Sequence, residues 1–132
     1  MKILAFLLLL ASPVLAQSNP EVAIPGFTVS ASASAPAVKT NTESYSAEVL
    51  ANGEVEVSLR AAASMIRQGK AIGALTVTVG NESQTVNFTG GAAQVVVPAI
   101  GNVRVTITVT LSAFVGLGSA SITMDDVYLT VR

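Results

Sequence analysis

The segment from residue 103 to residue 113 alternates strictly between aliphatic and polar side chains. Every odd position carries Val, Ile, Leu or Ala, and every even position carries Arg, Thr or Ser. Successive side chains of a β-strand point to opposite faces, so this period is typical of a strand with one buried face. We predict a strand here, and the rest of the chain must supply the sheets that cover its apolar face.

Shorter alternating segments recur at intervals of roughly ten residues, separated by Gly, Pro, Asn and Asp. Many short strands with such turn signals are typical of an antiparallel sandwich or barrel. We therefore predict an all-β fold, an antiparallel β-sandwich of about eight strands. The expected strands lie at residues 27–35, 45–49, 55–63, 75–79, 86–88, 93–97, 103–113 and 119–131.

Residues 60–68 leave two alternatives open. Ala is the best helix former, so the alanines in this stretch fit a short helix as well as a strand. We favour a strand through about Ala63, followed by a loop through Gly69 and Gly73.

Two sequences that contain glycine indicate hairpins. Asn52-Gly53 is the preferred pair for a two-residue type I′ turn, because both central residues of that turn need a positive φ. Gly116 and Gly118 interrupt the alternation near the end of the chain, and we expect them to join two long strands into a final hairpin.

The last expected strand changes phase at Asp125-Asp126. Apolar side chains occupy even positions before these aspartates and odd positions after them. A one-residue slip would turn the rest of the strand inside out, so we predict a β-bulge here. The alternative keeps even positions inward and buries Asp126 and Tyr128, which would require a partner for a buried carboxylate.

Residues 1–16 have the layout of a secretory signal peptide. Lys2 precedes an apolar run at residues 3–10, and Val14 and Ala16 stand at the positions that determine cleavage. The run is short for a membrane span, which needs about 20 residues, and an uncleaved anchor is the alternative. We expect a secreted protein, extracellular or at the cell surface, with no stable membrane span after cleavage.

The remaining chain divides into a flexible leader at residues 17–26 and a single β-sandwich domain at residues 27–132. Residues 27–36 alternate between apolar residues, most of them small, and Ser or Thr before ending at a proline. They fit the first strand of the domain, a mobile tether, or an arm that pairs with a neighbouring subunit.

The chain carries little charge. Its net charge is −1, and only 11% of its residues are charged. A nearly neutral surface gives no electrostatic reason to bind nucleic acid or anionic lipid. Since little charge repulsion keeps copies apart, we expect self-association.

The chain lacks residue types on which much enzyme chemistry depends. It has no His, Cys or Trp, so a serine nucleophile would have no histidine base beside it. Asp125 and Asp126 are adjacent and would point to opposite faces of a regular strand. Glu54 and Glu56 follow an expected turn, where we expect them to be solvated. We predict no enzymatic activity and no cofactor apart from a structural calcium ion, which is considered next.

The run from Gly118 to Leu129, GSASITMDDVYL, resembles the last strand of jelly-roll carbohydrate-binding modules and related galactose-binding-like domains. The resemblance extends over about residues 44–132 and implies a jelly-roll topology. In many such modules an aspartate of this strand helps to hold a structural calcium ion. The resemblance therefore implies calcium at Asp125 and Asp126, with Glu48 as a further ligand if its strand lies nearby.

One departure from these modules bears on the ligand. They bind sugars on exposed Trp and Tyr rings, whereas this chain has no Trp and two tyrosines, Tyr45 and Tyr128. The sequence therefore provides poorly for stacking on a sugar ring.

Two sequons are present, Asn81-Glu-Ser and Asn87-Phe-Thr. Asn81 and Asn87 are candidate glycosylation sites in an exported chain. Asn81 is the better candidate because we expect it in a turn.

Two functions fit these features. The first is a non-enzymatic, self-assembling structural subunit of an extracellular fibre, sheath or surface layer, which export, low charge and a spare N-terminal strand favour. The alternative is an extracellular carbohydrate-binding protein, which the resemblance favours and which would have a polysaccharide as its partner. We favour the first.

Overall fold

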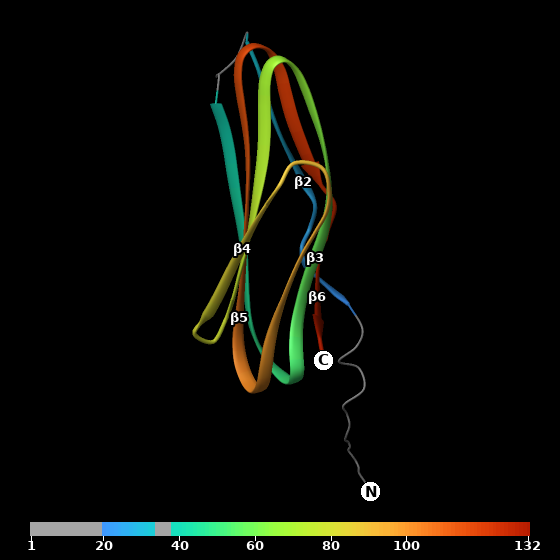
Figure 1. Cartoon of the computed structure of the whole chain (residues 1–132), viewed down its shortest axis with the longest axis vertical. Coiled ribbons are helices and arrows are strands. Elements are labelled where there is room, and N and C mark those ends of the chain that lie inside the picture. Colours follow the sequence, from blue (N-terminus) through green and yellow to red (C-terminus); the bar gives the residue numbers. More distant parts are fainter. Residues whose placement is uncertain (1–19, 34–37) are drawn as a thin grey trace, which may run out of the picture.

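The computed structural model describes residues 20–33 and 38–132, where the chain forms strands joined by turns and bends (Figure 1). In these ranges there is no helix of the length and apolarity that crossing a membrane requires. The expected signal peptide at residues 1–16 lies outside the described residues. The strands are β1 (Glu21–Ile24), β2 (Phe27–Ser32), β3 (Val38–Val79), β4 (Glu82–Phe88), β5 (Gly91–Met124) and β6 (Val127–Val131).

The two longest strands, β3 with 42 residues and β5 with 34, run antiparallel and pair over most of their lengths. Residues 38–61 of β3 pair with residues 91–114 of β5, and residues 61–79 pair with residues 105–124. One part of β5 therefore has β3 on both of its edges. This is possible because each long strand bends and contributes segments to two layers.

The pairings arrange the described chain in two layers, each four segments wide. Layer I consists, from edge to edge, of β4, residues 69–79, residues 103–115 and residues 38–49. Layer II consists of residues 91–99, residues 55–67, the end of β5 continued by β6, and β2 continued by β1. Consecutive segments pass from one layer to the other, except that β4 follows residues 69–79 within layer I, and this order is that of a jelly roll. The predicted antiparallel β-sandwich is thereby confirmed.

The long strands bend together at two corners, at opposite ends of the molecule (Figure 1). At the lower corner Gly101, with a φ of 92°, lies opposite Ala51. At the upper corner Gly118, with a φ of 94°, lies opposite Arg67, which has a φ of 60°. Positive φ values are easily reached by glycine, so these glycines allow a paired strand to change direction.

The hairpin predicted at Asn52-Gly53 is wrong. Positive φ among the described residues occurs elsewhere, and the segments on either side of this pair lie in different layers, where each pairs with β5. The amides of Asn52 and Glu54 donate to the carbonyl oxygen of Arg132, at 2.8 and 3.1 Å. The Asn-Gly pair marks a place where the strand bends, but the pairing partner of each flanking segment is β5, which is distant in the sequence.

The final hairpin is also wrong, because residues 103–115 belong to layer I and residues 118–131 to layer II. The loop expected after Ala63 is absent from the structure, and so is the alternative helix. Residues 60–73 continue β3, since β5 offers hydrogen-bonding partners along almost the whole stretch.

Part of the expected flexible leader forms a strand, because Glu21–Ile24 pairs with β6. Phe27–Ser32 forms β2 and pairs with residues 119–124 of the same chain. The arm hypothesis would need this strand to be free for a neighbour, whereas its β5-facing edge is already paired.

Residues 38–49 form an edge of layer I that pairs, among the described residues, with β5 alone. The burial of the core-facing side chains in this segment decreases toward its N-terminal end. Tyr45, Ala47 and Val49 are half-buried, whereas Lys39 and Glu43 extend beyond the core and are exposed.

The core between the layers is almost entirely aliphatic. The odd positions from 105 to 113 are buried, as the alternation predicts, and residues such as Leu75, Leu111 and Leu129 are at most 1% exposed. Burial of each such side chain contributes about 1.5–3 kcal/mol. With no cysteine in the chain, packing and sheet hydrogen bonds must hold the sandwich together.

We expect Leu111→Ala to lower the free energy of unfolding by about 2–5 kcal/mol, because it leaves a cavity between the layers. Leu50→Ala is the matched control, since Leu50 is 59% exposed, and it should change stability by less than about 0.5 kcal/mol. Chemical denaturation measures both values. Equal effects of the two substitutions would contradict the assignment of the core.

Candidate functional site

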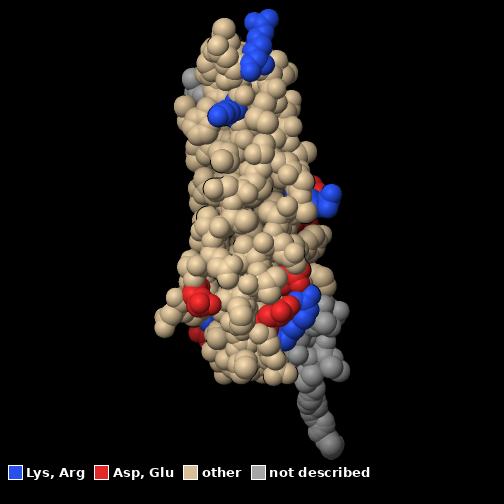
Figure 2. Space-filling model, viewed as in Figure 1, with Lys and Arg blue, Asp and Glu red and all other residues tan. Residues whose placement is uncertain are grey.

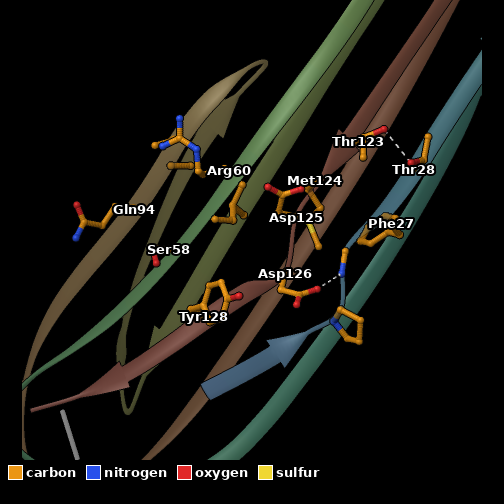
Figure 3. A pocket seen from close by; sticks show the side chains of 15 residues that line it. Phe27, Thr28, Ser58, Arg60, Gln94, Thr123, Met124, Asp125, Asp126 and Tyr128 are labelled. Atoms are coloured by element: carbon orange, nitrogen blue, oxygen red, sulfur yellow. Dashed lines mark hydrogen bonds between the residues drawn. The ribbon is translucent and has the colours of Figure 1, made fainter. Parts of the chain in front are cut away.

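A broad open groove of about 870 Å³ lies on the outer face of layer II (Figure 3). Its floor is formed where residues 58–60 of β3 run beside the junction of β5 and β6. The polar side chains that line it come from four neighbouring segments and are Thr28, Ser58, Arg60, Gln94, Thr123, Asp125, Asp126 and Tyr128.

A β-bulge shapes the groove. Ser58 pairs with Tyr128 and Ala61 with Met124, so two residues of β3 lie opposite three residues of the β5–β6 strand. The extra residue falls at Asp125-Asp126, as the change of phase predicts. Val127 is buried and Tyr128 exposed, so the alternative with Asp126 and Tyr128 buried is wrong.

The neighbouring strand is interrupted at the same level, at Pro25-Gly26 between β1 and β2. The amide of Gly26 donates to Oδ1 of Asp126 at 2.9 Å, and the amide of Asp125 donates to the carbonyl of Arg60 at 2.8 Å. A Cβ on Gly26 would lie 2.4 Å from the carbonyl oxygen of Met124. The two interruptions therefore fit each other only because residue 26 has no side chain.

Three groove side chains have polar groups that no described residue engages. The Arg60 guanidinium forms no ion pair with any described residue, since the ion pairs there involve Arg104 and Arg132. Asp125 and the 41% exposed Tyr128 likewise keep their side-chain oxygens free for a ligand, as judged from the described residues. Figure 3 shows Arg60 and Gln94 on one side of Asp125 and Tyr128 near the bulge.

The outer face of layer I is different, because its hydroxyl groups bind one another. Cross-strand pairs such as Thr42–Thr110 at 2.9 Å and Thr76–Thr85 at 2.9 Å run in rows across the layer. Such pairs stabilise a sheet and leave fewer donors and acceptors for a ligand. The groove on layer II is therefore the better candidate site.

Asp125 and Asp126 lie together at the groove, but Glu48 does not join them. No group of three or more Asp or Glu residues among those described is placed to hold a metal ion, and Glu48 pairs with Arg104 at 3.2 Å. Calcium needs six to eight oxygen ligands, and one oxygen of Asp126 already accepts the Gly26 amide. Asp125 and Asp126 supply two of the groups that an ion would need, and calcium at this site stays a prediction.

Glu54 and Glu56 both pair with Arg132, and their side chains are 39% and 18% exposed. Glu54 is therefore partly solvated, as expected, whereas Glu56 is largely covered. The hydrogen bond to Glu56 raises the pKa of Arg132 above its ordinary value. Gln94 also donates to Glu56, at 2.5 Å, so this carboxylate is held by two partners beside the groove.

The two candidate glycosylation residues lie at the edge of layer I. Asn81 stands in the turn between β3 and β4, where Gly80 has a φ of 61°, and Asn87 lies in β4. Both are exposed. Their glycosylation stays a prediction.

Sequence reasoning identified the bulge but not the side chains around it. Arg60 and Gln94 lie on the even positions of their strands, and the alternation of apolar and polar residues predicts that even positions face outward. That they meet Tyr128 depends on pairings between distant parts of the chain.

No protein-family model and no curated protein matches this chain. Among solved structures, it is similar to TmCBM61, a carbohydrate-binding module, in complex with β-1,4-galactotriose. The two share 20% sequence identity with a TM-score of 0.46, over 82% of this chain and 89% of that one.

Gly26→Ala should lower the free energy of unfolding by about 1–3 kcal/mol, because its Cβ would displace the backbone at Met124. Gly53→Ala is the control, as the nearest atom to its Cβ would be 3.8 Å away. Thermal unfolding of both variants measures the difference. A Gly26→Ala variant as stable as the control would show that the two interruptions are not closely fitted.

Proposed function

We propose that the protein is a non-catalytic extracellular binding protein whose groove on layer II takes a carbohydrate chain. The observation that carries the proposal is the exposed ring of Tyr128 beside the free Arg60 guanidinium and the Asp125 carboxylate. A sugar presents an apolar C–H face and a rim of hydroxyls. An aromatic ring suits the first, and charged planar groups suit the second.

The dimensions of the groove support a ligand of several sugar units. Its volume of about 870 Å³ lies in the upper part of the range of about 300–1,000 Å³ common for ligand sites. The groove is open rather than enclosed, which suits a segment of a longer polymer. Outer-face hydroxyls such as those of Thr28 and Thr123 offer further hydrogen bonds along its side, although these two also bond to each other at 2.8 Å.

The proposed function includes no catalytic activity. The chain has no His or Cys, and two of the three carboxylates at or beside the groove have structural partners: Asp126 accepts the Gly26 amide, and Glu56 binds Arg132. The proposal also includes export from the cell, which is inferred from the signal-peptide pattern of residues 1–16. N-terminal sequencing of the secreted protein tests the cleavage.

We favour binding over the structural-subunit hypothesis, because the strand that was expected to be spare pairs within the chain. Self-association itself stays a prediction, which sedimentation of the purified protein measures.

Tyr128→Ala and Arg60→Ala should each weaken carbohydrate binding about tenfold or more, whereas Tyr128→Phe should retain most of it. Thr42→Ala on layer I is the matched control and should bind as the parent does. Affinity electrophoresis against soluble polysaccharides, with β-1,4-galactotriose as one competitor, measures the change. Unfolding curves confirm that each variant is folded.

Failure of the parent protein to bind any polysaccharide tested would reject the proposal. So would groove variants that bind like the parent.

A further inference from the structure

The upper end of the molecule exposes a group of large apolar side chains, which we call the apolar end. Its members are between 41% and 53% exposed and are Met65, Ile66, Ile72, Phe114 and Leu117. Scattered exposed apolar residues are ordinary, but several at one end of a molecule make that end a candidate surface for contact with a partner.

The pairing of β3 with β5 places these residues around the upper corner, with Ile72 and Phe114 on the outer face of layer I and Ile66 on the outer face of layer II. Ile72 pairs with Ser112, two residues from Phe114, and Ile66 pairs with Ser119, two residues from Leu117. The five residues therefore lie on the segments that form the upper corner. Strand β6, which carries Tyr128 of the groove, lies toward the other end of the long axis (Figure 1).

Three cations surround the apolar end. Lys39 lies opposite Ala113, Lys70 opposite Phe114, and Arg67 opposite Gly118. None of the three takes part in an ion pair with a described residue. On the face seen in Figure 2, the charged side chains at the upper end are basic, whereas the middle and lower parts carry acidic side chains together with further basic ones. The small net charge of −1 thus conceals a cationic end.

We propose that this end docks on a membrane surface that contains anionic lipids. Apolar side chains at a protein tip gain free energy by entering the boundary between headgroups and acyl chains. Lys and Arg around such a tip bind lipid phosphates while their stems remain on the apolar surface. The site is separate from the groove and does not depend on the proposed carbohydrate function.

A second copy of the chain fits this end less well. Two upper ends that meet symmetrically would bring Lys39, Arg67 and Lys70 against the same cations of the other copy. The lower corner has Leu50 and Ile100 among its exposed apolar side chains, and Glu54 and Glu56 near it are already paired with Arg132.

Co-sedimentation with vesicles tests the proposal, using phosphatidylcholine alone and phosphatidylcholine mixed with phosphatidylserine. We expect the protein to bind the anionic vesicles and to release them as salt increases. Lys39→Gln, Arg67→Gln and Lys70→Gln should each weaken binding about fivefold.

The double variant Ile66→Ser/Leu117→Ser should lose the binding. The matched control is Leu50→Ser/Ile100→Ser, which alters exposed apolar residues at the other end and should bind as the parent does. All variants keep the same N-terminus, so any contribution of residues 1–16 cancels.

Absence of binding to anionic vesicles would overturn the proposal, and so would equal losses in the two double variants. Sedimentation velocity without vesicles gives the third readout. An oligomer that both double variants dissociate would identify a head-to-tail copy as the occupant and reject the membrane.

Discussion

The pairing between β3 and β5 is the constraint on which the rest of the structure depends. Two strands that stay hydrogen-bonded over so many residues must bend at the same places, or their backbone amides and carbonyls would be left unpaired. The corners, the two layers and the closed aliphatic core follow from this requirement. The shorter strands β1, β2, β4 and β6 add to the layers that the segments of β3 and β5 form.

The alternation of side chains predicted much of this fold, because it depends on local geometry that every strand shares. Val57, Ile107 and Leu129 are all buried on the face that their phase indicates. Partners were not predictable in the same way. Asn52-Gly53 is a good hairpin sequence, but the segments on either side of it lie in different layers and each pairs with β5.

The candidate site was predictable to a similar extent. The change of phase at Asp125-Asp126 indicated a bulge, since a buried strand cannot reverse its faces without one. The partners of the bulge could not be predicted, because Gly26 and Arg60 reach it through pairings between residues that are far apart in the chain. The calcium prediction rests on likeness in one strand, and that strand contributes two carboxylates, Asp125 and Asp126, toward the oxygen ligands that an ion would need.

The edge at residues 38–49 has a consequence for how the protein behaves when it is crowded. A strand from another molecule that added to this edge would have to cover Lys39 and Glu43 on the side that continues the core. Removing those charges from water without compensating partners is costly, so the edge is a poor template for β-addition. One of the four outer edges of the two layers is therefore guarded by charge against the addition of a strand from another molecule.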